Sequence, residues 1–215
     1  MKLLIENWRE YLREEQGSSV IAHLVGQAGS GKTYFIDNTL LKKYPEIVAQ
    51  DLDDFDDEAD AVVASKAGDK SWRMDLDENN HVKDQKLARK HFEAVQNLVN
   101  QFISANSDKK IFLAGMSVFP WVQGNNELNL GNPQMKIYLD IDPQKAAERR
   151  IKRDVDKGLY RGRPAPSQEG FEKELEWAAE EKTKLLSAGY KAATEDEIIK
   201  AVGAIMQGEP DETPT

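Results

Sequence analysis

Three glycines, a lysine and a threonine stand together in the stretch GQAGSGKT, residues 26–33. It satisfies the pattern G-x-x-x-x-G-K-[ST], known as Walker A, and follows an apolar run at residues 20–25. Glycines permit backbone angles and close approaches that side chains forbid, so consecutive N–H groups can point at phosphate oxygens, and the next helix adds its positive dipole end. We therefore expect a loop that binds ATP through Gly26, Gln27, Ala28, Gly29, Ser30, Gly31, Lys32 and Thr33.

Two side chains of this loop have distinct expected roles. Lys32 would bring a positive charge to the β- and γ-phosphates, and the Thr33 hydroxyl would be a ligand of Mg²⁺. A glycine-rich turn that carries Lys-Thr by coincidence is the alternative, and the strand before the loop and the helix after it count against that alternative.

Acidic residues follow the second expected strand, in the stretch DLDDF at residues 51–55. A carboxylate there can accept a hydrogen bond from an acceptor hydroxyl and orient it toward the γ-phosphate, while a neighbour supports the metal shell. We expect Asp51 and Asp53 to act in this way, with Asp51 also as a metal ligand, and Asp54 to contact the acceptor. The acids that follow this stretch are expected to form a solvated loop: Asp56, Asp57, Glu58 and Asp60.

A basic segment at residues 145–163 carries eight Lys or Arg side chains and three acids, although the whole chain has a net charge of −9. On a helix Arg149, Arg150 and Arg153 share one broad face, because they are spaced by three and four residues. Guanidinium groups suit the charge spread over a transferring phosphoryl group. The alternative is a solvated basic face paired with Glu148 and Asp154.

The phosphate acceptor should bind beyond the carboxyl ends of the strands, which directs attention to residues 55–83 and 117–130. Trp72 and Arg73 are candidates there, since an indole can stack on a base and an arginine can bind a phosphate or a carbonyl. Simple packing is the alternative for Trp72 and is favoured for Trp121. We expect His23 to be a packed, hydrogen-bonded residue of a strand and His91 to fall on the stripe of a helix.

Strands and helices alternate along the sequence. Strands are predicted at residues 19–25, 46–50, 110–116, 135–142 and 189–191, and helices at 2–15, from the loop to 41, at 87–105, from 143, at 168–186 and after 194. This order predicts an α/β fold with three αβα layers around a parallel sheet. One domain is expected over residues 1–206, followed by a disordered acidic tail at 207–215.

The composition excludes several classes of protein. The chain of 215 residues has no cysteine, so it has neither disulfides nor thiolate metal sites, and it has no apolar run long enough to span a membrane. We expect an intracellular, cytoplasmic protein. The acidic balance argues against a surface that binds nucleic acid as a whole, since such binding needs clustered Lys and Arg.

The stretches GQAGSGKT, DLDDF and IYLDIDPQKAAERRIKRD together resemble the P-loop kinases of nucleosides, nucleotides, polynucleotide ends and related small molecules, over residues 19–203. The resemblance implies a helical lid at about 145–166 and an acceptor-side insertion. It also implies ATP and Mg²⁺, a general base at Asp53 or next at Asp51, and lid arginines over the donor phosphates at Arg149, Arg150, Arg153 and, less directly, Arg161 and Arg163.

Three functions follow from these observations. The leading one is a kinase that phosphorylates a hydroxyl of a nucleoside, nucleotide or similar small molecule. The second phosphorylates nucleic acid, at a 5′ hydroxyl or a hydroxymethylated base, and the basic segment keeps it open. The third is an NTPase or nucleotide-binding regulator without a phosphoryl acceptor. The acids after the second strand and the arginines disfavour this third function.

Overall fold

A computed structural model of the chain describes residues 19–63, 71–79, 81–156 and 168–207. In chain order the elements are β1 (Val20–Val25), α2 (Lys32–Phe35), the π-helical turn η1 (Ile36–Leu40), α3 (Leu41–Lys43), β2 (Ile47–Asp51), α4 (Leu52–Val63), the 3₁₀ turn η2 (Ser71–Met74), α5 (Gln85–Ala105), β3 (Lys110–Ala114), β4 (Met135–Leu139), α6 (Pro143–Asp156), α7 (Gln168–Ser187), β5 (Lys191–Ala193) and α8 (Glu195–Gln207). The predicted first helix, residues 208–215 of the tail, and Arg161 and Arg163 of the lid lie outside the described residues.

The five strands form one sheet in the order β2-β3-β1-β4-β5. Strand β2 pairs with β3 in parallel, from Ile47 opposite Lys110 to Asp51 opposite Ala114, and β4 pairs in parallel with β5. Parallel neighbours need crossover connections, and helices supply them here. The predicted α/β fold with a parallel sheet is confirmed, in agreement with the three-layer arrangement.

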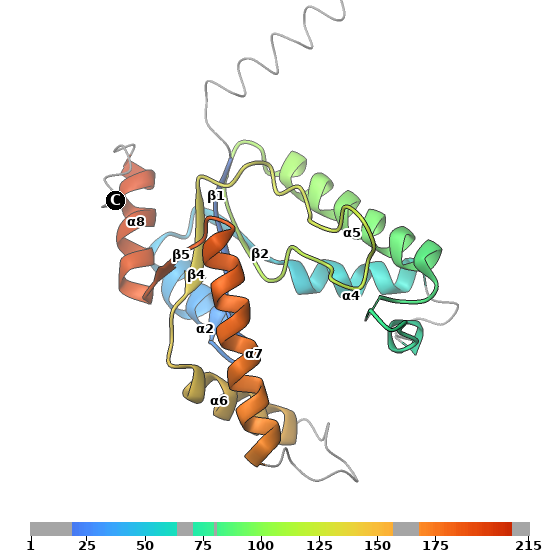
Figure 1. Cartoon of the computed structure of the whole chain (residues 1–215). Coiled ribbons are helices and arrows are strands. Elements are labelled where there is room, and N and C mark those ends of the chain that lie inside the picture. Colours follow the sequence, from blue (N-terminus) through green and yellow to red (C-terminus); the bar gives the residue numbers. More distant parts are fainter. Residues whose placement is uncertain (1–18, 64–70, 80, 157–167, 208–215) are drawn as a thin grey trace, which may run out of the picture. The chain divides into compact units, whose positions relative to one another are not determined.

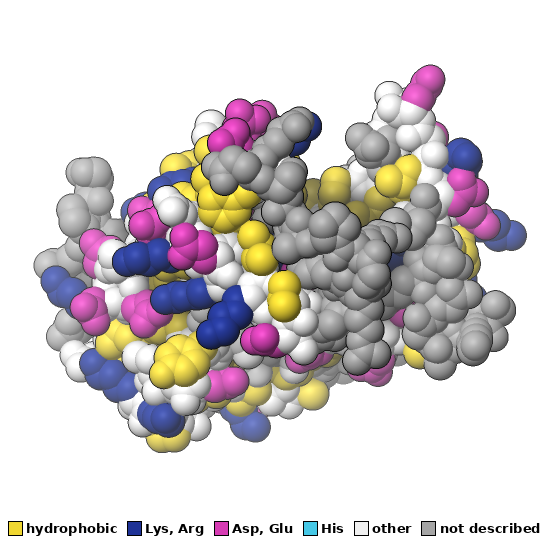
Figure 2. Space-filling model, turned by 90° about the horizontal axis from the view of Figure 1, so that it is seen from below, with side chains coloured by type: hydrophobic (Ala, Val, Ile, Leu, Met, Phe, Trp, Pro, Cys, Tyr) yellow, Lys and Arg dark blue, Asp and Glu magenta, His cyan; other side chains and the backbone are white. Residues whose placement is uncertain are grey.

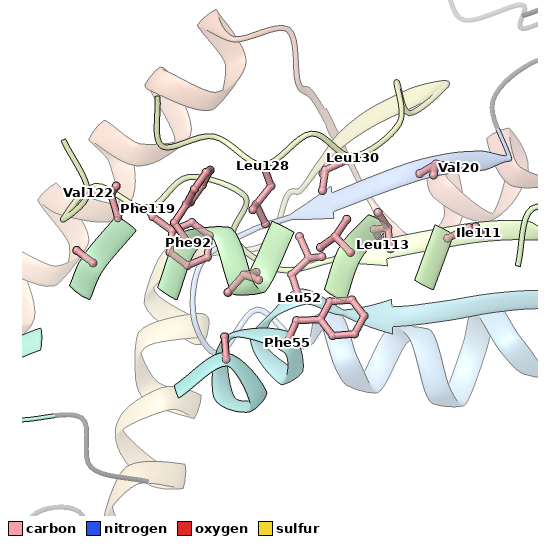
Figure 3. Packing of buried hydrophobic residues seen from close by; sticks show 14 of the residues in the cluster. Val20, Leu52, Phe55, Phe92, Ile111, Leu113, Phe119, Val122, Leu128 and Leu130 are labelled. Carbon is pink, nitrogen blue, oxygen red and sulfur yellow. The ribbon is translucent and has the colours of Figure 1, made fainter. Parts of the chain in front are cut away.

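The chain divides into two compact units, and Figure 1 labels the helices and strands that belong to them. The first unit contains residues 46–134 and the start of β1 up to His23, and the second contains residues 24–45 and those from 135 onward. In the first unit α4 packs against α5, and their apolar faces join side chains of β3 and the following loop in one core (Figure 3). In the second unit α6 packs against α7, and α7 packs against β4.

In the sequence, Leu87, His91, Val95, Leu98 and Phe102 predict one apolar stripe on this helix, and α5 confirms it only in part. His91 and Val95 are fully buried, but Leu87, Leu98 and Phe102 are half-buried. The buried face is centred instead on Ala88, Phe92, Val95 and Val99. The helix begins where the Asp84 side chain accepts a hydrogen bond from the Leu87 backbone N–H at 3.0 Å, an N-cap.

The acidic stretch after β2 is a helix, and the prediction of a solvated loop there is wrong. Asp51 is the residue before α4, and its Oδ1 accepts a hydrogen bond from the Asp53 backbone N–H at 3.1 Å, which caps the helix. Acids in the first turn also suit the positive end of the helix dipole. The positions of Leu52, Phe55 and Ala59 at i, i+3 and i+7 then give α4 a buried apolar face.

Strand β5 begins two residues later than predicted, at Lys191. Helix α7 ends in a left-handed turn at Gly189, with φ of 89°, and the backbone N–H of Tyr190 donates to the Leu185 carbonyl at 3.1 Å. These two residues thus complete the end of the helix and are not available to the sheet. None of the described helices is both long and apolar enough to cross a membrane.

Thr194 and Glu197, three residues apart, predict a capping box, and the structure forms it at the start of α8. The Thr194 backbone N–H donates to Glu197 Oε2 at 2.8 Å, and the Glu197 N–H reaches the Thr194 hydroxyl at 3.4 Å. The Thr194 backbone N–H first, and then the Thr194 hydroxyl that donates to Oε2 at 2.8 Å, hold the pKa of Glu197 below its ordinary value. Each side chain therefore satisfies a backbone donor that the helix itself cannot satisfy.

Thr194→Ala should lower the free energy of unfolding by about 1 kcal/mol, because it deletes the capping hydroxyl. Chemical denaturation followed by circular dichroism measures this change. Thr194→Ser keeps the hydroxyl and is the matched control. Equal stability of the alanine and serine variants would contradict the role of the cap.

Candidate functional site

The phosphate loop lies in the second unit, between the end of β1 and the start of α2. Gly31 is the N-cap residue of α2, and its carbonyl accepts the Phe35 N–H at 2.8 Å. Gly29 has a left-handed φ of 85°. A Cβ atom at Gly29 would clash with the Ala146 carbonyl oxygen of α6 and lie 3.0 Å from the Arg150 backbone nitrogen. The loop therefore packs against α6 backbone to backbone, which only a glycine permits.

Polar groups of the loop fit a phosphate ligand. The Ser30 hydroxyl is buried and has no hydrogen-bond partner among the described residues, which is costly unless a ligand or water supplies one. The Lys32 ammonium donates to the Gly26 carbonyl at 2.8 Å, so the lysine folds back over its own loop. A helix start, a glycine cradle, an ammonium group and an unsatisfied hydroxyl together suit the triphosphate of a nucleotide.

A carboxylate of α7 that sequence analysis missed lies in the electrostatic environment of Lys32. Glu181 is half-buried, and burial raises its pKa, while the positive charges of Lys32 and Lys184 oppose this rise. Tyr138 lies beside the loop, and burial, followed by the Glu181 and Asp140 carboxylates, raises its pKa. A hydrogen bond with the Gln27 backbone lowers this pKa in part. No local pattern marks Glu181 or Tyr138, because helix and strand bring them to the loop from distant positions.

The structure separates the three predicted arginines of α6. A Cβ atom at Gly31 would lie 3.7 Å from Arg149 Nη1, and one at Gly29 would lie 3.1 Å from the Arg150 Cβ, so both residues lie at the phosphate loop. Arg153 instead pairs with Asp154. Its Nε donates to Asp154 Oδ1 at 3.1 Å, and its Nη2 lies 3.0 Å from the same oxygen. Arg150 Nε lies 3.7 Å from Asp154 Oδ2. The alternative of ion pairing with Asp154 thus holds for Arg153 and in part for Arg150.

The first unit brings Asp51 and Asp53 together at the ends of β2 and β3. Strand β3 ends at Ala114, and a Cβ atom at Gly115 would lie 2.9 Å from Asp51 Oδ1 and 3.3 Å from Asp53 Oδ1. The fully buried His23 forms a 2.9 Å hydrogen bond from Nε2 to the Gly115 carbonyl, which confirms its predicted packed role. Sequence analysis missed Gly115, although a glycine directly after an apolar strand is a signal for close backbone approach.

The remaining predicted ligands have these positions. Asp54 Oδ2 accepts a hydrogen bond from Gln50 Nε2 at 3.0 Å, so β2 holds this carboxylate at the start of α4. The two predicted metal ligands, Thr33 and Asp51, belong to different units. Within the described ranges no three His, Asp or Glu side chains are grouped so as to hold a metal ion. A Mg²⁺ ion bound mainly by phosphates and water needs no such group.

Arg73 of η2 has partners that the sequence did not reveal. Its Nη1 donates to Asp56 Oδ2 at 2.8 Å and its Nη2 donates to Asp60 Oδ1 at 2.7 Å. The Nη2 atom also lies 2.9 Å from His91 Nε2 of α5. Asp60 is only 1% exposed, which corrects the prediction of a solvated carboxylate. Its burial is tolerated because the guanidinium compensates its charge.

Aromatic rings surround this ion-pair network. The Arg73 guanidinium carbon lies 5.3 Å from the Trp72 ring centre and 5.6 Å from that of Trp121, within cation–π distance. Trp72 and His91 have ring centroids 5.3 Å apart, and Phe119 and Trp121 have centroids 5.2 Å apart. Both tryptophans therefore pack, as the alternative held, and they pack around the same arginine.

The charged side chains drawn in colour on the face shown in Figure 2 are mixed in sign. In the view of Figure 2, the coloured Lys and Arg side chains lie among Asp and Glu side chains and do not merge into one basic patch. Binding to nucleic acid depends on many phosphate contacts from clustered cations. This face of the described side chains does not supply such a cluster.

Comparison with known proteins gives a likeness of structure alone. No family model and no curated protein matches the chain. Among solved structures it is similar to a shikimate kinase from Acinetobacter baumannii in complex with shikimate, with a TM-score of 0.42 and 16% sequence identity, over 87% of this chain and 92% of that chain. A likeness at this level leaves the function to be inferred from the site itself.

Gly29→Ala should weaken ATP binding at least tenfold, because the added methyl group displaces the loop from α6. Isothermal titration calorimetry with Mg²⁺ and a non-hydrolysable ATP analogue measures the affinity. Gly189→Ala is the matched control: it has a similar φ, of 89°, but no atom lies within 4 Å of its Cβ position. Comparable affinities of the two variants would show that the close approach to α6 is unimportant.

Stability should fall between pH 7 and pH 5 in a way that depends on His91. Burial and then the Arg73 charge lower the pKa of His91 below the ordinary value of about 6.5, so in this range the unfolded chain binds the proton more tightly. Each proton taken up only on unfolding contributes a slope of up to about 1.4 kcal/mol per pH unit. Urea denaturation of the wild type should show this slope, and His91→Gln should lack part of it. His81→Gln is the control and should keep the slope, because the half-buried His81 lies beside Asp77 and outside the Arg73 network.

Proposed function

We propose that the chain is a kinase that transfers the γ-phosphate of ATP, in the presence of Mg²⁺, to a hydroxyl group of a nucleoside, nucleotide or related small molecule. The observation that carries the proposal is the phosphate loop, in which a glycine cradle packed on α6, an unsatisfied buried hydroxyl and an ammonium group meet at a helix start. The single kinase domain over residues 1–206, with its lid at about 145–166, is part of the same proposal.

The donor end of the reaction belongs to the second unit. Lys32 and the loop N–H groups would bind the β- and γ-phosphates, and Thr33 would hold Mg²⁺, which neutralises charge on those phosphates. Arg149 is the arginine best placed to stabilise the transferring group, since its guanidinium lies at Gly31 and has no ion pair within the described part of the chain. Arg150 would bind the donor phosphates beside it, and Arg153 would support the helix through Asp154.

The acceptor end of the reaction belongs to the first unit, and Asp53 is the proposed general base. Asp51 caps α4 through its Oδ1, and Asp54 accepts a hydrogen bond from Gln50, so both carboxylates are bound in structural hydrogen bonds. Asp53 is exposed in the first turn of α4 beside Gly115. Its carboxylate would take the proton of the acceptor hydroxyl as the oxygen bonds to the γ-phosphorus and the bond to the β-phosphate oxygen breaks, which releases ADP.

A label-transfer screen tests the function directly. ATP labelled at the γ-phosphate is offered with nucleosides, nucleotides, small hydroxylated metabolites and hydroxyl-ended DNA. Label on a small molecule is the expected result. Label found only as free phosphate would mean that the chain hydrolyses ATP without an acceptor and would refute the proposal, and so would undiminished transfer by Lys32→Ala.

Asp53→Asn should lower kcat by about 10²- to 10⁴-fold with little change in ATP affinity, because it removes the base and leaves the donor site intact. Asp51→Asn should keep most of its structural role, since asparagine also caps helices well. Glu58→Gln, exposed on α4, is the control and should match the wild type. A larger loss of kcat in Asp51→Asn than in Asp53→Asn would assign the base to Asp51.

A further inference from the structure

We propose that the cluster of Trp72, Arg73, His91 and Trp121, together with Asp56 and Asp60, binds an uncharged, flat, hydrogen-bond-accepting ring, the base of a nucleoside acceptor, and thereby presents its hydroxyl to Asp53. The inference rests on the proposed function for the fate of that hydroxyl. The binding site itself is argued from the first unit alone, to which all of these residues belong.

The cluster contains buried polar atoms that nothing in the described part of the chain satisfies. The nitrogens among them are Trp72 Nε1, Trp121 Nε1, Arg73 Nε and His91 Nδ1, and the buried carboxylate oxygen Asp60 Oδ2 lies in the same cluster. A buried polar group without a partner costs about 1–3 kcal/mol, and native structures contain only a few per 100 residues. Four such atoms around one arginine therefore point to a ligand that this cluster is built to receive.

Three of these four nitrogens are hydrogen-bond donors in either tautomer of His91. The indole and guanidinium nitrogens can only donate. His91 Nε2 lies 2.9 Å from Arg73 Nη2, a donor, and 3.2 Å from the Asp56 backbone oxygen, an acceptor, so either ring nitrogen of a neutral histidine can carry the proton. The low pKa of His91, which burial and the Arg73 charge depress, agrees with the neutral form. The ligand must therefore offer acceptors, such as carbonyl oxygens or unprotonated ring nitrogens.

The charge of the cluster disfavours an anionic ligand. Asp56 binds Arg73 at 2.8 Å and Asp60 binds it at 2.7 Å, so two carboxylates outweigh one guanidinium. With His91 neutral, the side chains carry a net negative charge. A phosphate or carboxylate ligand would lie near two carboxylates, and the one guanidinium of the cluster is already paired with them. Like charges in a desolvated site repel strongly. A neutral acceptor-rich group meets the same donors without this cost.

The side chains around these donors suit a flat ring. Trp72 and Trp121 are each half-buried, so part of each indole remains accessible, while Arg73 lies within 5.6 Å of both ring centres. Stacking on an aromatic side chain favours a ring with a π face. A pyrimidine or purine base combines such a face with carbonyl or ring-nitrogen acceptors, as a sugar alone does not.

The cluster lies within reach of the proposed base along α4. Asp53, Asp56 and Asp60 stand at i, i+3 and i+7, so they share one face of the helix. At a rise of about 1.5 Å per residue, Asp56 is about 4.5 Å and Asp60 about 10 Å further along the axis than Asp53. A ring bound at the cluster and a hydroxyl at Asp53 would thus be separated by the length of a small molecule, as in a nucleoside.

Calorimetry with the whole chain tests the site without chemistry, in the presence of ADP and Mg²⁺. The probes are thymidine, cytidine, adenosine and guanosine, against thymidine monophosphate and shikimate as anionic probes. At least one nucleoside should bind more tightly than both anions. Tighter binding of either anion, or no binding of any nucleoside, would overturn the proposal.

Two conservative variants locate the binding. Trp72→Phe and Trp121→Phe each keep an aromatic ring and remove one donor, so each should weaken nucleoside binding by roughly two- to tenfold while ATP affinity stays unchanged. Trp177→Phe is the matched control, since Trp177 is 55% exposed on α7 in the other unit. Nucleoside affinities of both cluster variants equal to that of the control would refute the site.

The label-transfer screen separates this inference from the proposed function. Nucleoside binding that the cluster variants weaken, with no label transferred to any acceptor, would refute the kinase and leave the binding site standing. Transfer of label only to a phosphorylated or carboxylated acceptor, or only to DNA, would refute the site and leave the kinase standing.

Discussion

The absence of a side chain at residue 29 is the constraint on which the packing of the phosphate loop against α6 depends. Any Cβ atom there would meet the backbone of α6, so the phosphate loop and the arginine-bearing helix can pack only with glycine at this position. The same close approach sets Arg149 and Arg150 beside the loop, while Arg153, one turn on, turns to Asp154. Backbone packing thus decides which arginines of one helical face can meet a phosphate.

In the first unit, one buried ion-pair network holds η2 to two helices, α4 and α5. Arg73 bridges Asp56 and Asp60 of α4 and His91 of α5, over sequence separations of 17, 13 and 18 residues. Burying these charges is costly, and it is tolerated because each is paired inside a shell of aromatic rings. The network fixes the position of η2 at the expense of donors that stay unsatisfied, which is the pattern of a binding site more than of an optimised core.

The two acids at the end of β2 illustrate how local structure divides chemical roles. A carboxylate that caps a helix is already bonded to a backbone N–H, which favours its charged form and its fixed position. Asp51 is in this situation, whereas Asp53 follows it in the first helical turn. The Gly115 backbone, held by His23, lies against both carboxylates.

The sequence by itself determined the phosphate loop, the order of strands and helices, the parallel α/β fold and the capping box of α8, because each is encoded by residues a few positions apart. It did not reveal that the acids after β2 form a helix, since their charges concealed the spacing of Leu52, Phe55 and Ala59. Only the tertiary structure decided the partners of Arg73, the burial of Asp60 and the place of Glu181 near Lys32. These three features depend on which helices and strands pack together. Local periodicity in the sequence does not predict which charged residues from distant parts of the chain will pair.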